Sequence, residues 1–226
     1  MDHTEKYRFE PLKFDERPPE EMVERAQSFY ELMNLRRTVR HFSDRPIPRE
    51  VMEAAILTAG TAPSGAHKQP WHFALVGEAE TKRRIRIAAE KEEKESYERR
   101  MPQSWLDDLK PMGTDWQKPY LESCPWLILV FAKAWDPPES PGGERRKNYY
   151  VPESVGISVG MLLAALHNAG VATLTHPPSP MGFLKEVVGR PENERAYMLI
   201  ATGYPEEGCE VPSLQRKALD EILSRA

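Results

Sequence analysis

The sequence predicts an α+β fold, with a central sheet covered by helices. The clearest sign is PWLILVFA, residues 125–132, a continuous apolar run that is typical of a strand buried on both faces. A second sign is that strand-like and helix-like segments alternate along the chain. Their order is irregular, which separates the pattern from the regular repeat of a parallel α/β fold.

The elements can be assigned in chain order. Residues 1–18 are polar and contain proline, so we expect an extended arm. Apolar residues at helical spacing predict a helix over 18–36. The next helix, 47–60, has Pro48 for its first turn and Gly60, which fits a left-handed cap. The later segments are expected to be strands at 71–77, 125–132, 171–175 and 196–205, and helices at 81–101 and 152–170.

Composition narrows the class of protein. The chain has 226 residues and a net charge of −4, so no basic field favours nucleic acid. No apolar run approaches the roughly 18–20 residues of a membrane span, and the first residues lack the apolar core of a signal peptide. Cys124 and Cys209 form neither a CxxC motif nor a metal cluster. We therefore expect a soluble cytoplasmic protein without a metal.

The helix at 152–170 is apolar on nearly all sides, and we expect it to be buried all round. Gly156 and Gly160 lie four residues apart, so a second backbone can approach that face closely. Two interpretations remain open for this helix. It is either the core helix of a monomer or the centre of a dimer interface.

The helix at 81–101 has a different character. Its EKEEKE stretch is polar on all sides and should be held weakly. However, Glu93, Tyr97 and Met101 share one face, and Pro102 then interrupts the helix. Aromatic residues and a lysine follow in GTDWQKPY, residues 113–120. The segment is either a solvated surface helix or a lid that closes over a ligand.

Basic residues form two small clusters in this acidic chain. Arg36, Arg37 and Arg40 lie within five residues, and Arg216 and Lys217 lie near the C-terminus. Guanidinium groups suit a phosphate, although scattered surface charge is the alternative. The sequence has no GxGxxG after a strand and no GxxxxGK[ST]. A bound phosphate would therefore not belong to a Rossmann dinucleotide or a P-loop nucleotide.

The stretch RRTVRHFSDRPIPREVMEAAILTAGTAPSGAHKQPWHF, residues 36–73, resembles the start of flavin-dependent nitroreductase-fold proteins. The similarity continues through VGISVGMLLAALHNAG, VATLT, ATGYP and QRKALDEI, so it covers the chain from Leu35 onward. GTAPSGAH and the insert containing EEKESYERRM and DWQKPYL look most like the iodotyrosine deiodinases. We expect no counterpart of the membrane anchor that the vertebrate members carry.

The resemblance implies one nitroreductase-like domain over 1–226, with a central mixed sheet flanked by helices and a lid at about 90–120. It also implies a homodimer with FMN at the subunit interface. Carried over by position, the residues implied to bind FMN are Arg36, Arg37, Thr38, Arg40, Pro63, Ser64, Gly65, Thr173, Thr175 and Arg216. The Thr175 hydroxyl is implied to reach flavin N5 and favour one-electron steps. The THPPSP segment after Thr175 is richer in proline than the family pattern.

The same resemblance implies a halotyrosine substrate. The backbone N–H of Ala66 would meet its phenolate, and Glu93, Tyr97 and Lys118 would hold its ammonium and carboxylate groups. This explains the small residues of GTAPSGA, residues 60–66, because a thin wall lets flat rings stack and exposes backbone N–H donors. His67 beside this wall is expected to be structural.

The implied reaction is FMN-dependent reductive dehalogenation, iodotyrosine to tyrosine plus iodide, with electrons from an external reductase or NAD(P)H system. Three alternatives remain open. One is a general FMN nitroreductase or quinone reductase of the same fold, and another is a binding module without turnover. The third is thiol-based dehalogenation through Cys124 or Cys209, which neither cysteine's surroundings in the sequence favour.

Overall fold

The computed structural model describes residues 9–138, 140 and 142–225. These residues fall into two units that meet between Leu35 and Arg36, and each is described by itself. The first unit contains helix α1 (Pro19–Asn34), which confirms the first predicted helix, and none of its residues is buried. Of the predicted arm, residues 1–8 lie outside the described residues, and residues 9–18 contain no helix or strand.

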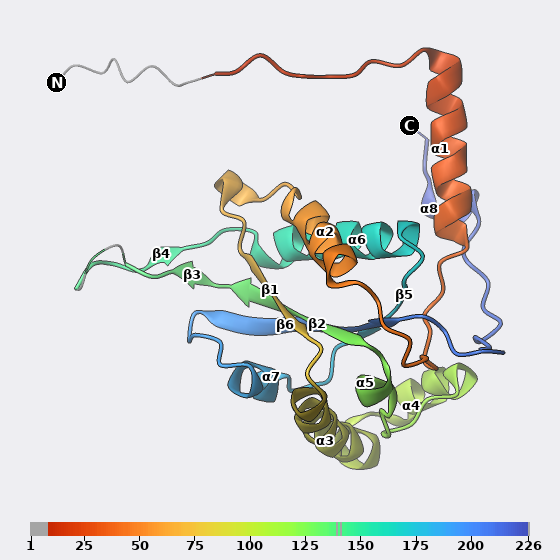
Figure 1. The fold of residues 1–226 in the computed structure, drawn as a ribbon, viewed down its shortest axis with the longest axis vertical. Coiled ribbons are helices and arrows are strands. Elements are labelled where there is room, and N and C mark those ends of the chain that lie inside the picture. Colours follow the sequence, from red (N-terminus) through yellow and green to blue (C-terminus); the bar gives the residue numbers. More distant parts are fainter. Residues whose placement is uncertain (1–8, 139, 141, 226) are drawn as a thin grey trace. The chain divides into compact units, whose positions relative to one another are not determined.

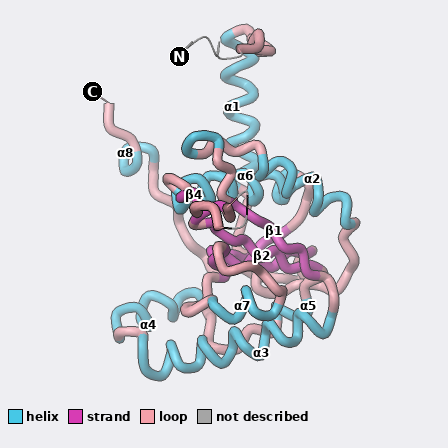
Figure 2. The backbone as a smooth tube through the Cα atoms, turned by 90° about the vertical axis from the view of Figure 1, so that its left-hand side faces the viewer, coloured by secondary structure: helices cyan, strands magenta, loops and turns pink. Residues whose placement is uncertain are grey.

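The second unit has three layers, with a sheet between two sets of helices (Figure 1). Helices α2 and α6 cover one face, and α3, α5 and α7 cover the other, as the turned view in Figure 2 also shows. The elements are α2 (Arg49–Gly60), β1 (Trp71–Val76), α3 (Ala79–Glu95), α4 (Gln103–Leu109), α5 (Tyr120–Ser123), β2 (Trp126–Lys133), β3 (Trp135–Asp136), β4 (Arg146–Lys147), α6 (Val151–Asn168), β5 (Ala172–His176), α7 (Gly182–Val187), β6 (Glu194–Gly203) and α8 (Leu219–Ile222).

The main sheet has the strand order β1-β2-β6-β5, and its ladders are antiparallel. Parallel pairing occurs in an isolated bridge between Thr38 and Thr173, which adds the segment before α2 to the edge strand β5. The mixed character predicted for the sheet therefore comes from this bridge. Strands β3 and β4 form a separate two-stranded sheet that the sequence patterns did not predict.

Strand β2 is the centre of the core, as predicted from its apolar run. Leu127, Leu129 and Phe131 pack with the helices of one layer, and Ile128 and Val130 pack with those of the other. All five side chains are fully buried. The alternation of faces along an extended strand explains why every position of this segment is apolar.

The two glycines at helix ends behave differently. Gly170 has φ +78°, the left-handed conformation that commonly ends a helix. The same prediction is wrong for Gly60, which is the last residue of α2 and is followed by Thr61 in a right-handed conformation. The N–H groups of Thr61 and Ala62 bond to the carbonyls of Thr58 and Ala59, so the turn continues without a left-handed residue.

Helix α6 is buried on one face only, so the prediction of burial on every side is wrong for the single chain. Its inner face packs under α2, where the hydroxyl of Ser158 donates to the carbonyl of Ala59 at 2.8 Å. On the outer face Ile157 is 47% exposed, and a Cβ added at Gly160 would meet nothing within 4 Å. An apolar sequence indicates burial but does not say whether the covering chain is the same molecule.

The segment predicted to form a lid contains more structure than its sequence indicated. Helix α3 runs into a π-helical turn at Ser96–Arg100, and α4 follows Pro102. Of the two interpretations left open for this segment, a helix that is solvated on all sides does not fit, because Glu93 in the EKEEKE stretch is buried. Helices α4, α5, α7 and α8 had no clear periodic signal because all are seven residues or shorter.

Candidate active site

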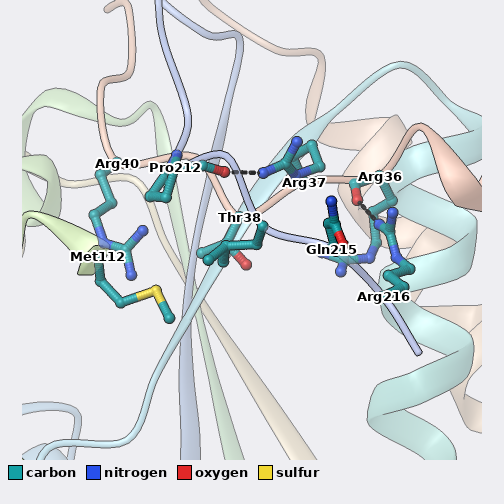
Figure 3. A pocket seen from close by; sticks show the side chains of 9 residues that line it. Arg36, Arg37, Thr38, Arg40, Met112, Pro212, Gln215 and Arg216 are labelled. Carbon is teal, nitrogen blue, oxygen red and sulfur yellow. Dashed lines mark hydrogen bonds between the residues drawn. The ribbon is translucent and has the colours of Figure 1, made fainter. Parts of the chain in front are cut away.

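Four arginines gather around a cavity of about 360 Å³, called here the arginine cavity. Figure 3 shows Arg40 beside Met112 on one side of Thr38, and Arg36 with Arg216 on the other. The lining residues are Arg36, Arg37, Thr38, Arg40, Met112, Pro212, Leu214, Gln215 and Arg216. Five of the predicted FMN-binding residues thus meet here, although the two basic clusters lie 180 positions apart in the sequence.

Backbone contacts hold the arginines in place. The N–H of Val39 donates to the carbonyl of Thr173 at 3.2 Å, which ties residues 36–40 to strand β5. The Arg216 guanidinium donates to the carbonyl of Arg36 at 2.7 Å, and Arg37 donates to the carbonyl of Pro212. These bonds orient the cationic groups without neutralising them.

The electrostatics of the arginine cavity favour an anion. Burial lowers the pKa of Arg36, and the charges of Arg216 and Arg37 lower it further. Each charged group that shifts this pKa is another arginine, so positive charge is concentrated where water is partly excluded. Forked guanidinium donors in such a place suit a phosphate oxygen.

A second cavity of about 290 Å³, called here the Glu93 cavity, shares Arg40 with the first. Its walls come from the end of α3, the π-helical turn, α4, the segment before α5 and the end of β5. The lining residues include Glu93, Tyr97, Lys118 and Thr175, which were predicted as site residues. They also include Ser96, Trp105, Leu109 and Tyr120, which lie in the segment predicted as a lid, and His176, which was not predicted.

Glu93 and Lys118 form an ion pair in this cavity. Lys118 Nζ lies 3.3 Å from Glu93 Oε2, and the two side chains are 3% and 11% exposed. Lys118 also donates to the carbonyl of Asp115 and, at 3.4 Å, to the hydroxyl of Thr114. The Tyr97 ring lies 5.4 Å from the Lys118 ammonium, and its hydroxyl donates to the carbonyl of Thr114.

Burial works against both charges of this pair. It raises the pKa of Glu93, and the Lys118 charge only partly opposes that effect. It lowers the pKa of Lys118, and Glu93 again opposes. Two buried charges that are incompletely compensated gain from any ligand that brings an ammonium to the carboxylate and a carboxylate to the ammonium.

Two further side chains lie next to this pair: Tyr120, which the sequence placed in the predicted lid without a binding role, and His176, which it did not single out as a site residue. The Tyr120 oxygen lies 3.1 Å from His176 Nδ1, and both residues are buried. The other ring nitrogen, Nε2, lies 3.8 Å from Glu93 Oε1 and has no hydrogen-bond partner among the described residues. Sequence position could have indicated both residues, because Tyr120 follows Lys118 by two residues and His176 follows Thr175 directly.

The predicted loop at Pro63, Ser64, Gly65 and Ala66 lines neither cavity of its own chain. It lies against the start of α6, where the Gly65 N–H points to the Ser154 hydroxyl at 3.4 Å. A Cβ at Gly65 would lie 3.0 Å from the carbonyl of Tyr149, which explains the need for glycine. Ala66, His67 and Gln69 all have positive φ, a conformation that non-glycine residues adopt at a cost of about 1–3 kcal/mol.

The remaining predicted residues are placed as follows. Thr173 and Thr175 lie two apart on β5, and Thr175 lines the Glu93 cavity, whereas Thr173 is buried at the bridge to Thr38. Burial raises the pKa of the Cys124 thiol to about 11, and burial also raises that of Cys209. Neither cysteine lines either cavity, so thiol chemistry finds no support.

Comparisons with known proteins agree on the family. The nitroreductase family model matches residues 34–204. The chain is 59% identical over 199 residues to the iodotyrosine deiodinase of Haliscomenobacter hydrossis, covering 88% of this chain and 89% of the relative. It is 44% identical over 214 residues to human iodotyrosine deiodinase 1, covering 94% of this chain and 73% of the relative.

A solved structure gives the same result. The crystal structure of oxidized iodotyrosine deiodinase bound to FMN and 3-iodo-L-tyrosine matches with a TM-score of 0.71 and 30% identity, covering 84% of this chain and 96% of that one. The residues that the family model matches, 34–204, contain the main sheet and both helical layers. The chain belongs to the nitroreductase family and, within it, to the iodotyrosine deiodinases.

Proposed function

We propose that this protein is an FMN-dependent reductive dehalogenase of halotyrosines, which converts iodotyrosine to tyrosine and iodide. The observation that carries the proposal is the buried Glu93–Lys118 pair in a cavity that adjoins a cluster of arginines. An amino acid and a phosphate-bearing cofactor are the ligands that these two neighbouring charge patterns fit.

The arginine cavity fits the phosphate of FMN. Arg36, Arg37, Arg40 and Arg216 supply cationic donors, and the lowered pKa of Arg36 reflects positive charge that an anion would balance. Thr38 pairs with Thr173 on β5, and Thr175, two residues further along that strand, lines the Glu93 cavity. When bound, FMN supplies the two electrons that replacement of a carbon–halogen bond by a carbon–hydrogen bond requires.

The Glu93 cavity fits the zwitterion of a halotyrosine. Lys118 would bind the carboxylate, Glu93 the ammonium, and Tyr97 would add a ring contact and a hydrogen bond. Because the pair is already buried, Glu93 and Lys118 have lost most of their solvation before the ligand binds. The ligand charges can therefore stabilise both groups without first displacing much water. A plain nitroreductase or quinone reductase would leave this buried pair without a ligand to bind.

A second copy of the chain would complete the site. The loop with Pro63, Ser64, Gly65 and Ala66 lies outside both cavities of its own chain, and the outer face of α6 exposes Ile157 and Gly160. Pairing two copies along that face would cover it and allow the loop of one to reach the cavities of the other. The Ala66 N–H would then be available as a donor to a substrate phenolate.

The electron donor and the cellular location rest on the sequence prediction, an external reductase or NAD(P)H system in the cytoplasm. None of the helices that the structure describes has the length and apolar character needed to cross a membrane.

The proposal can be tested with the FMN-loaded protein and two ligands, 3-iodotyrosine and 2-iodophenol, which lacks the zwitterion. Binding is followed by the flavin absorbance, and turnover by iodide release under a chemical reductant. We expect 3-iodotyrosine to bind far more tightly and to release iodide. Equal response to both ligands, or reduction of nitroaromatics alone, would favour the general nitroreductase.

A further inference from the structure

His176 stands out because it is buried, faces the candidate substrate site and has an unused ring nitrogen. It is 8% exposed and lines the Glu93 cavity beside Thr175. Its Nε2 has no hydrogen-bond partner among the described residues, although Glu93 Oε1 lies 3.8 Å away. A buried polar atom without a partner is costly, so its position needs a reason.

Tyr120 decides which ring nitrogen carries the proton. Burial raises the pKa of the Tyr120 hydroxyl well above its usual range, so the group stays protonated and can donate. Its partner at 3.1 Å is His176 Nδ1, which then accepts, and the ring proton is on Nε2. The opposite arrangement would leave the phenol proton without this acceptor and turn a lone pair of His176 toward a carboxylate.

The ring is also neutral. Burial lowers the pKa of His176 to about 3, and the Lys118 charge contributes to the shift. A neutral N–H differs from a cation at this position, because it can orient a carboxylate without cancelling its charge. Glu93 would keep its attraction for an ammonium while one oxygen is fixed.

Glu93 is therefore shared between two neighbours on different sides. Oε2 faces Lys118 at 3.3 Å, and Oε1 faces His176 at 3.8 Å. The second distance exceeds the usual 2.7–3.2 Å range of a hydrogen bond, so this contact would form fully only when the cavity tightens around a ligand. Without His176, both oxygens would be free to turn toward Lys118 and away from the ligand ammonium.

We propose that His176, oriented by Tyr120, is a positioning residue that holds the Glu93 carboxylate for the ammonium of the substrate and so selects amino acids over phenols without an amino group. This inference rests on the proposed halotyrosine site. It assigns a selectivity role to Tyr120 and His176, which contact Glu93 directly or through one another and take no part in electron transfer.

The test compares two ligands, 3-iodotyrosine and 3-(3-iodo-4-hydroxyphenyl)propanoic acid, which keeps the carboxylate but lacks the amino group. Three variants of the FMN-loaded protein are measured by flavin fluorescence. His176→Met removes the donor, His176→Gln keeps an N–H donor near the position of Nε2, and Tyr120→Phe removes the hydroxyl that sets the tautomer. His72→Gln is the matched control, because His72 lies on β1 and lines neither cavity.

We expect His176→Met to weaken 3-iodotyrosine binding at least 10-fold while changing the acid less than 3-fold. Tyr120→Phe should fall between this variant and wild type, and His176→Gln should recover most of the selectivity. If His176→Met does not fold, Tyr120→Phe decides the matter. The proposal is overturned if both ligands weaken equally, or if selectivity is unchanged in His176→Met or, where that variant does not fold, in Tyr120→Phe.

A spectroscopic readout separates positioning from simple packing. In a ¹⁵N-histidine spectrum, the signal lost in His176→Gln should show a protonated Nε2 and an unprotonated Nδ1, and the opposite tautomer overturns the proposal. Wild type provides the check on the proposed function itself. If wild type does not prefer 3-iodotyrosine over the acid, the halotyrosine site is wrong, whereas wild-type preference without an effect of the variants rejects only the role of His176.

Discussion

Lys118 and Glu93 form an ion pair from which solvent is almost completely excluded, with 3.3 Å between Nζ and Oε2. They come from different elements, since Glu93 lies on α3 and Lys118 precedes α5. The backbone N–H of Lys118 also donates to the Glu90 carboxylate at 2.7 Å, which fixes the segment before α5 against α3. The pair is thus held in place before any ligand binds.

The first prediction concerns this pair. Glu93→Gln should weaken 3-iodotyrosine binding roughly 10- to 100-fold, because a hydrogen bond to a charged group contributes about 1.5–3 kcal/mol. It should also lower the free energy of unfolding by up to about 3–5 kcal/mol, since Lys118 loses its buried partner. Flavin titration and urea denaturation measure the two effects.

The double variant Glu93→Gln/Lys118→Met separates the effect on ligand binding from the effect on stability. It should recover part of the stability, because no buried charge is left unpaired, but none of the affinity. Asp107→Asn is the control, since it breaks the exposed Lys110–Asp107 pair, which contributes at most about 1 kcal/mol. Unchanged affinity in Glu93→Gln would remove the assignment of the zwitterion site.

The second prediction concerns the arginine cavity. Arg36→Ala and Arg216→Ala should each weaken FMN binding roughly 10- to 100-fold, because each removes a charged donor that is proposed to bind the phosphate. The flavin-to-protein absorbance ratio after gel filtration and titration of the apoprotein measure this loss. Arg83→Ala is the control, because Arg83 is exposed and pairs with Glu80 on α3. Full flavin content in the Arg36→Ala/Arg216→Ala variant would place the phosphate elsewhere.

The core of the fold and the candidate site differ in how far the sequence predicts them. The core strand β2 could be predicted because each of its residues from Leu127 to Phe131 is apolar, as expected for a strand buried on both faces. The arginine cavity was predictable only in part, since Arg36 and Arg216 look like separate charge clusters until the fold joins them. The resemblance supplied that link, whereas composition alone could not.

His176 and Glu93 show what sequence patterns omit. Glu93 lies in a run of charged residues that normally indicates solvent, and its burial depends on β5 and on the segment around Lys118. The sequence patterns gave the His176 side chain no role, because the phenol that orients its ring comes from a residue 56 positions away. The wrong prediction of burial on every side of α6 has a similar origin, because an apolar sequence does not say which chain covers the outer face of a helix.

The third prediction tests the second copy. Gly160→Leu should leave the fold of one chain intact, because a Cβ there meets nothing within 4 Å and glycine is a poor helix former. It should nevertheless disrupt a close helix contact between two copies. We expect sedimentation velocity to change from dimer to monomer, with FMN lost and iodide release at least 10-fold slower.

Ile87→Lys provides the matched control for this surface. Ile87 is also an exposed apolar residue, but it lies on α3 on the other side of the sheet. This variant should remain a dimer and keep its activity. A wild-type protein that sediments as a monomer, or a Gly160→Leu protein that stays a fully active dimer, would contradict the shared site.

The fourth prediction concerns Thr175. Thr175→Ala should still bind 3-iodotyrosine, because Glu93, Tyr97 and Lys118 remain. Dehalogenation should slow on the order of 10-fold, as loss of the proposed hydrogen bond to the cofactor implies. Nitroaromatic reduction should be retained, so the ratio of the two rates is the informative quantity. Thr175→Ser should restore the ratio. An equal fall of both rates in Thr175→Ala would indicate damage to the fold instead of a role in dehalogenation.

The last prediction concerns stability and pH, through His176. Burial and the Lys118 charge lower the pKa of His176 to about 3 from a usual value of 6.5. Above pH 6.5 the ring is neutral in both folded and unfolded chains, so its contribution to stability is fully present. As the pH falls from 6.5 toward 3, only the unfolded chain takes up the proton, and that contribution is lost.

The groups that face the ring are Tyr120, Glu93 and Lys118, and they are unchanged in a His176→Gln variant. Because each pKa unit corresponds to about 1.4 kcal/mol, wild type should lose about 2 kcal/mol more than His176→Gln between pH 7.5 and pH 5. Urea denaturation of the FMN-loaded proteins at pH 7.5, 6.5, 5.5 and 5.0 measures the difference. Parallel pH profiles for the two proteins would mean that His176 accepts a proton in the folded state, and a neutral donor beside Glu93 would then be excluded.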